Sequence, residues 1–343
     1  MNPVHTLAPL LLAAPLAPLA AQAAAPTAYH VTHDIKLGGD GRWDYVTLDS
    51  VGHRLFIARQ NRVMVVDPKS GKLLGEIPGL DGAHGTAMAY AAGHGFATSG
   101  RDGSVTMFDL SSLKVLARIK AADDADAILY DPSSKRIFTF NGDANSSTAI
   151  DPESGKVIGS IALGGKPEFG VSSGSGRLYV NIEDKGEIAE LDPDKLQVLR
   201  RWPLEGCEEP TGLAIDRAND LLFSVCHSKV MAISDARAGR TIADVPIGGG
   251  VDGAAFDPGT RLAFASNGDG TITVVHEDSP TTFHVVSTAT TRRGARTMTL
   301  DPRTHRLYTV TADFGETPAP TESDPHPRPS LLPGTFSLLV LEP

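Results

Sequence analysis

One position of a long-period repeat carries most of the side chains in this sequence that could do chemistry. The residues there are Asp44, Thr86, Asp126, Glu168, Thr211, Asp252 and Arg296, at intervals of 40 to 44 residues. Carboxylates brought together with an arginine could hold a cation, bind an amine, or serve as acid and base in hydrolysis. The alternative is that they are solvated loop residues or hydrogen-bonding caps of strand ends.

Each of these residues precedes a short apolar segment that predicts a strand. The segments are YVTLD (45–49), AMAYA (87–91), AILYD (127–131), FGVSS (169–173), GLAID (212–216), GAAFD (253–257) and TMTLD (297–301). A second strand such as HRLFIA or HRLYTV follows, and several copies then contain a third strand and a turn such as VDPKSGK or IDPESGK. Self-similarity at this period marks the blade of a β-propeller.

The stretch from Ala125 to Gly165 shows one blade in full, as four short apolar runs joined by polar turns. The last repeat has segments for only three strands, at 295–301, 305–312 and 335–341, whereas residues 29–37 form a strand with no repeat of its own. We therefore predict an all-β, seven-bladed β-propeller of four-stranded antiparallel blades, in which the N-terminal strand completes the last blade. The predicted domain is 26–343, with blades starting near positions 43, 84, 125, 167, 209, 251 and 295.

The N-terminus predicts export. Residues 1–25 contain an apolar core and end in small residues of the A-x-A type, which favours a signal peptide over a disordered Ala/Pro arm. The mature protein is then periplasmic or secreted, without a membrane span. The formal net charge of -10 disfavours nucleic acid as a partner.

A long segment, 313–334, separates the second and third strands of the last repeat. It emerges on the same face as the recurring charged position, so it is either a lid over that face or a Pro-rich loop without function. The lid would use Phe314, Glu316, His326 and Arg328.

Histidines and cysteines give weaker signals. No histidine shows a metal-ligand spacing, and His84 is the histidine expected beside the charged position. Cys207 and Cys226 are expected at the same end of the fifth blade. They form either a disulfide, which an oxidising compartment favours, or a soft-metal site with His227.

The repeats, the D-P-x-S-G-K turns and the segment FGETPAP…PRP…LPGTFSLLVLEP resemble the YncE-like (YVTN-type) β-propeller family of bacterial exported proteins, over about residues 29–343. The resemblance implies the fold but no settled reaction, because such propellers host lactonases, dehydrogenase subunits and binding scaffolds.

We expect a monomeric binding or scaffold module for a small molecule or a periplasmic protein. The candidate binding residues at the channel mouth are Asp44, His84, Asp126, Glu168, Asp252 and Arg296. One alternative is a metal-dependent hydrolase of the propeller lactonase kind, with a divalent cation at Asp44, Asp126, Glu168 and Asp252. Another is a partner subunit of a periplasmic dehydrogenase. The sequence leaves open whether the protein is an enzyme.

Overall fold

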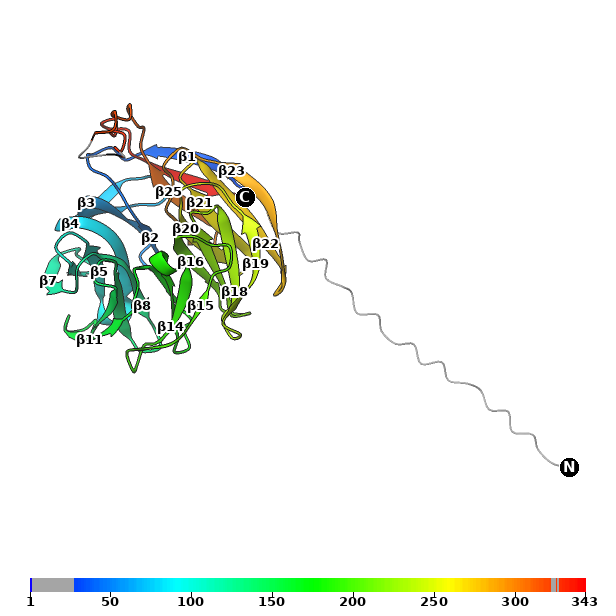
Figure 1. Cartoon of the computed structure of the whole chain (residues 1–343). Helices are drawn as coiled ribbons and strands as arrows, with labels where there is room; N and C mark the ends of the chain where they lie inside the picture. The colour runs from blue at the N-terminus through cyan, green and yellow to red at the C-terminus, as the bar shows by residue number, and fades with distance from the viewer. Residues whose placement is uncertain (2–27, 322–324, 326) are drawn as a thin grey trace.

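The computed structural model describes residues 1, 28–321, 325 and 327–343, and its strands are arranged around a central axis (Figure 1). The predicted signal peptide (1–25) falls almost wholly outside the described residues, as does His326. Within the described part of the chain, no helix is long and apolar enough to cross a membrane.

The described residues form six antiparallel sheets, which confirms an all-β propeller of four-stranded antiparallel units. Four of these sheets each correspond to a single repeat. The third and fourth repeats form the sheets of β8 (Ala125–Asp131), β9 (Arg136–Asn141), β10 (Ser146–Ile150) and β11 (Val157–Ala162), and of β12 (Pro167–Ser172), β13 (Leu178–Ile182), β14 (Glu187–Asp192) and β15 (Gln197–Pro203). The fifth repeat forms the sheet of β16 (Pro210–Asp216), β17 (Leu221–Cys226), β18 (Val230–Asp235) and β19 (Arg240–Pro246). The sixth repeat forms the sheet of β20 (Val251–Asp257), β21 (Leu262–Asn267), β22 (Thr271–Ser279) and β23 (Thr282–Thr290).

The first two repeats share one six-stranded sheet. Its strands are β2 (Val46–Asp49), β3 (Arg54–Val66), β4 (Leu73–Ala89), β5 (His94–Ser99), β6 (Ser104–Asp109) and β7 (Val115–Lys120). The prediction of seven separate blades is therefore wrong, because the described residues form six sheets. The reason lies in β4, which pairs with β3 from Leu73 to Ala83 and with β5 from Ala83 to Ala89, and so runs from one repeat into the next without a break. Two short 3-10 helices complete the described elements, at Tyr90–Ala92 and Glu183–Lys185.

The remaining sheet joins the two ends of the described chain, in the order β1 (His30–Lys36), β26 (Ser337–Glu342), β25 (Arg306–Thr311) and β24 (Met298–Asp301). The pairing of β1 with β26 is antiparallel, from His30 opposite Glu342 to Lys36 opposite Ser337. In Figure 1 the blue β1 lies beside the red C-terminal strand.

The D-P-x-S-G-K turns have a local cause. The Asp151 carboxylate accepts a hydrogen bond from the backbone N–H of Ser154 at 2.7 Å, and Gly155 then adopts a left-handed φ of 69°. Asp67, Ser70 and Gly71 repeat this geometry in the first unit. An aspartate that closes its own turn, followed by a glycine that accepts a positive φ, reverses the chain without strain.

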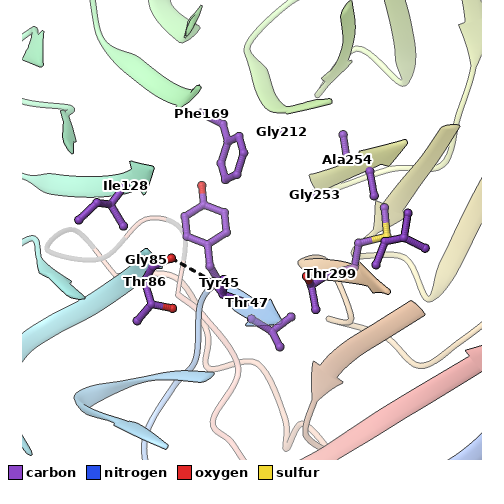
Figure 2. A pocket seen from close by; sticks show the side chains of 14 residues that line it. Tyr45, Thr47, Gly85, Thr86, Ile128, Phe169, Gly212, Gly253, Ala254 and Thr299 are labelled. Carbon is purple, nitrogen blue, oxygen red and sulfur yellow. Dashed lines mark hydrogen bonds between the residues drawn. The ribbon is translucent and has the colours of Figure 1, made fainter. Parts of the chain in front are cut away.

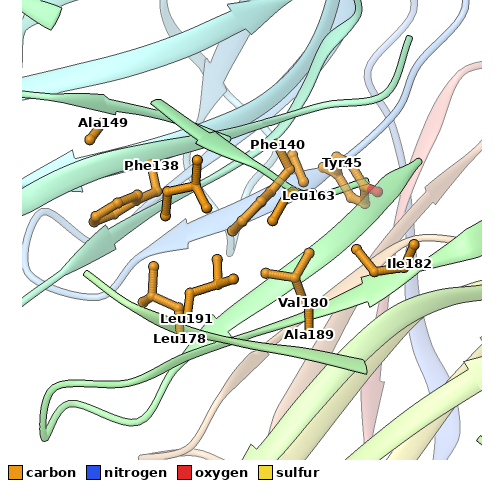
Figure 3. Close-up of a cluster of buried hydrophobic side chains, with 12 residues drawn as sticks. Tyr45, Phe138, Phe140, Ala149, Leu163, Leu178, Val180, Ile182, Ala189 and Leu191 are labelled. Carbon is orange, nitrogen blue, oxygen red and sulfur yellow. The ribbon is translucent and has the colours of Figure 1, made fainter. Parts of the chain in front are cut away.

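The hydrophobic core lies between neighbouring sheets. Figure 3 shows Phe138 and Phe140 of β9 facing Leu178 and Val180 of β13, and all four side chains are fully buried. Because strand side chains alternate between the two faces of a sheet, each sheet can pack against both of its neighbours. Cys207 and Cys226 are joined by a disulfide, which is the first of the two alternatives that the sequence left open.

The inner strands β2, β4, β8, β12, β16, β20 and β24 contact one another in a ring, so that seven repeats are distributed over six sheets. The approach is closest at Gly212 of β16. A Cβ atom there would lie 2.7 Å from the Ala254 backbone nitrogen and 2.9 Å from the Asp252 carbonyl oxygen, both on β20. Backbone atoms cannot move aside as a flexible side chain can.

Gly212→Ala should therefore lower the free energy of unfolding by about 1–3 kcal/mol, since an added methyl group overpacks the ring. Urea denaturation measures this. Gly249→Ala is the matched control, because the nearest atom to its Cβ is Lys229 Cε, at 3.3 Å on a flexible side chain. Equal stability of the two variants would contradict the close approach.

Candidate functional site

The candidate residues at the channel mouth lie where the inner strands begin, and a β-bulge recurs at this point. Pairing of β8 with β9 shifts between Ala125 and Ile128, and pairing of β20 with β21 shifts between Val251 and Gly253. β4, β12 and β16 show the same irregularity. A bulge frees a side chain from the strand alternation and re-aims it. The first bulged residues are His84, Asp126, Glu168, Thr211 and Asp252.

The structure therefore corrects one position of the repeat. In the second unit the bulged residue is His84, whereas Thr86 is a buried strand residue whose carbonyl accepts a hydrogen bond from Thr47. Counting back from the end of each first strand missed this equivalence. A signal existed, because a glycine follows His84 just as a glycine follows Thr211 and Asp252.

Glycines and hydroxyls bring successive mouth residues together. The Cβ atom that Gly85 lacks would lie 3.4 Å from the Asp126 carbonyl oxygen, and that of Gly253 would lie 3.2 Å from the Arg296 carbonyl oxygen. The same two carbonyls accept hydrogen bonds of 2.5 Å from Thr98 and from Ser266. Asp126 and Arg296 are thus each held by the repeat that precedes them.

His84 lies between two carboxylates. Its Nδ1 is 2.5 Å from Asp44 Oδ2 and 3.2 Å from Asp126 Oδ1. Burial alone would lower the pKa of His84, but hydrogen bonds and charge from Asp126 and Asp44 raise it to about 11. Its Nδ1–H donates to Asp44 as the nearer acceptor, and Asp126 Oδ1, 3.2 Å away, is held beside it as an ion-pair partner.

Arg296 lies between two carboxylates of the mouth, those of Asp252 and Asp44. Its Nε is 2.5 Å from Asp252 Oδ2, and one of its terminal nitrogens is 3.4 Å from Asp44 Oδ1. Burial raises the pKa of Asp252 to about 6 despite this partner. Asp252 and Asp44 in turn raise the pKa of Arg296, although burial opposes them.

Glu168 has no such cation. No hydrogen bond or ion pair to its carboxyl group is found in the described part of the chain, and Lys166 instead pairs with Glu183 at 2.6 Å. Burial, followed by the charges of Asp126 and Asp252, raises the pKa of Glu168 well above its ordinary value of 4.5. This carboxyl group therefore takes up a proton more readily than an exposed glutamate does.

Tyr45, the residue after Asp44, points toward Phe169 in a pocket between the inner strands (Figure 2). Its ring centroid is 5.3 Å from that of Phe169, and both rings line an apolar cavity of about 220 Å³ together with the small residues Gly85, Gly212 and Gly253. Burial, and then the nearby carboxylates, raise the pKa of its hydroxyl far above the ordinary value. The cavity is lined by none of the charged residues of the mouth.

A second cavity, of about 320 Å³, opens beside the mouth. It is lined by Arg42, Trp43, Asp44, Gln60, Gly82, Ala83, His84, Arg101, Arg296 and Arg328. Arg42 donates to the Pro329 carbonyl oxygen at 3.1 Å, and Arg101 lies 3.5 Å from exposed Asp81. Four arginines and the protonated His84 face a single lining carboxylate, that of Asp44. The sequence drew attention to Asp44, His84, Arg296 and Arg328 of this lining but not to Arg42 or Arg101, so its basic character was not expected.

Two of the predicted lid residues reach the mouth. Phe314 packs against Trp43 with ring centroids 6.0 Å apart, and Arg328 lines the basic cavity. Both also line a smaller cavity of about 60 Å³ next to it. Glu316 is exposed and lines neither cavity, and His326 is outside the described residues.

Comparison with known proteins supports the fold alone. No family model and no curated protein matches the chain. Among solved structures, a chain of Kuenenia stuttgartiensis hydrazine synthase is similar, with a TM-score of 0.69 and 16% sequence identity over 81% of this chain and 94% of that chain. At this identity the likeness shows a β-propeller fold and carries no activity across.

Glu168→Gln should make the protein relatively more stable than wild type as the pH rises. The folded-state pKa of Glu168 lies above the unfolded value, so its contribution to stability is present below about pH 4.5 and is lost as the pH rises toward the folded-state pKa. Glutamine has no such proton to lose. Unfolding in urea at pH 4.5, 6 and 8 measures the difference, with exposed Glu153→Gln as the control. A constant difference across this range would refute the shift.

Proposed function

We propose that this β-propeller is a binding module that holds a small anionic molecule at the channel mouth. The observation that carries the proposal is the 320 Å³ cavity lined by Arg42, Arg101, Arg296 and Arg328. Its size suits a metabolite rather than a folded partner. Arginine offers several N–H donors in a planar fork that matches carboxylate and phosphate groups. A basic cavity in a chain of net charge -10 is a local feature that the overall composition conceals.

The ring of carboxylates then has a supporting role. His84 and Arg296 already lie between Asp44, Asp126 and Asp252, so the cations that balance these acids belong to the protein itself. This arrangement fixes both cationic side chains at the floor of the cavity before a ligand arrives. Pre-organised donors bind with a smaller entropic cost than mobile ones.

Trp43 supplies an apolar wall. It lines the basic cavity, and its ring packs against Phe314 and Phe336 at centroid distances of 6.0 and 5.4 Å. Its indole N–H is buried without an acceptor among the described residues. A ligand with an apolar or planar portion beside its anionic group would pack that portion against the indole ring.

The wider setting of the module is part of the proposal. We infer an exported protein of the YncE-like kind, in which the pairing of β1 with β26 closes the ring. This rests on the repeats, on the A-x-A signature near residue 22 and on the antiparallel pairing of β1 with β26. The predicted compartment is the periplasm.

The charge-removing variants Arg101→Gln and Arg328→Gln should each weaken binding of citrate or inorganic pyrophosphate by about 5- to 100-fold, because a hydrogen bond to a charged group contributes about 1–3 kcal/mol. Titration calorimetry measures this. The control is Arg237→Gln, whose side chain is 72% exposed and pairs with Asp220 away from the cavity. The anionic-ligand proposal fails if wild type binds neither citrate nor pyrophosphate. It also fails if the three variants bind these probes with equal affinity.

A second candidate function is a metal-dependent hydrolase, and one observation favours it. Asp44, His84 and Asp126 each offer a ligand atom, and these atoms lie within 4.8 Å of one another. The donor set fits a divalent cation, which when bound would polarise a carbonyl group and lower the pKa of a water molecule. The proton on His84, however, competes for Nδ1 up to about pH 11.

We therefore expect Ca²⁺ and Mg²⁺ to show no binding at pH 7 that depends on Asp126. Calorimetric titration of wild type and Asp126→Asn tests this expectation. Saturable binding by wild type that the substitution abolishes would instead support the hydrolase.

A further inference from the structure

A second group of metal-ligand side chains lies far from the mouth, on the hairpin formed by β22 and β23. His276 of β22 is paired directly opposite His284 of β23. Asp278 lies two residues after His276 on the same strand, so it shares a face with His276. The register shifts between Glu277 and Ser279, which places Asp278 in a bulge beside the turn.

The three side chains already converge. Asp278 Oδ1 lies 2.8 Å from His276 Nδ1, and Asp278 Oδ2 lies 2.6 Å from His284 Nδ1. The two imidazole rings are 5.9 Å apart between centroids. One potential ligand atom from each residue lies within 4.8 Å of the others, so little movement is needed to bring them onto a single ion.

We propose that His276, Asp278 and His284 form a binding site for a divalent transition-metal ion such as Zn²⁺. Two imidazole nitrogens and a carboxylate oxygen suit Zn²⁺, Cu²⁺ or Ni²⁺, whereas Ca²⁺ and Mg²⁺ prefer oxygen ligands alone. The exposed face of the hairpin leaves further coordination positions to water. Such an ion would join β22 to β23, the outermost strand of its sheet.

The site is independent of the proposed ligand cavity. The mouth lies at one end of this sheet. At that end Val251 of β20 pairs with Asn267 of β21, and Asn267 pairs with Thr271 of β22. His276 follows Thr271 by five residues along an extended strand, a separation of roughly 17 Å. The neighbouring Glu277 faces the other way, because it is buried and its Oε1 accepts a hydrogen bond from Asn219 at 2.7 Å.

Titration of the full chain with Zn²⁺ tests the site, using protein without a polyhistidine tag. Wild type should bind Zn²⁺, and His284→Gln should weaken that binding by at least about 100-fold, since a ligand is lost. Asp278→Asn removes the negative charge but keeps the side-chain shape, and should weaken binding by about 10- to 100-fold. His284 is 54% exposed, so its variant should melt at the wild-type temperature in the absence of metal.

The control variant is His84→Gln, which removes the histidine of the mouth and should leave this Zn²⁺ binding intact. Electron paramagnetic resonance of the Cu²⁺-loaded protein should show two coordinating nitrogens in wild type and one in His284→Gln. The proposal is overturned if wild type does not bind Zn²⁺ or if His284→Gln binds it as tightly as wild type. Loss of the binding in His84→Gln alone would also overturn it, by assigning the ion to the mouth.

Discussion

The close approach of the inner strands around the central axis is the constraint on which the rest of the structure depends. Strands that meet at this distance leave no room for side chains between their backbones, so glycine occupies the contact points at 85, 212 and 253. Larger side chains must lie between the sheets, where Phe138 and Phe140 are fully buried. The same crowding leaves a cavity beside the glycines, which is lined by the rings of Tyr45 and Phe169.

A bulge at the start of five inner strands, β4, β8, β12, β16 and β20, helps to turn this packing into a site. It takes one side chain of each of these strands out of the strand alternation. Because the units converge there, acids from different repeats come within reach of one another, and burial makes their charges costly. The structure offsets this cost with its own cations, His84 and Arg296, while Glu168 has none. The mouth is therefore a charged surface in which the protonation of each carboxyl group depends on the charged side chains beside it.

The repeats build the ring, whereas the differences between them create specific sites. Arg101 lies in the turn between β5 and β6, Gln60 lies within the long strand β3, and Arg328 comes from the long segment of the last repeat. The hairpin with His276 and His284 likewise occurs in one repeat alone among those described. The chain shares its fold with a chain of hydrazine synthase at 16% identity. The fold therefore does not determine the chemistry, which depends on residues that differ between the repeats.

The sequence by itself determined the all-β propeller. Turn aspartates and glycines such as Asp151 and Gly155 act locally, and the period of the repeat corresponds to the length of one four-stranded unit. It also placed Asp44, Asp126, Glu168, Asp252 and Arg296 at the start of inner strands, since that position follows from counting along the repeat. Tertiary structure alone decided that β4 runs unbroken through two repeats, that His84 rather than Thr86 occupies the recurring position, and that four arginines meet beside it. These features depend on strand register and on contacts between residues as distant as Arg42 and Pro329, which no local pattern records. The sequence therefore shows which residue types occupy the recurring position. The pairing of its acids with His84 and Arg296 arises only when the ring is formed and brings them together.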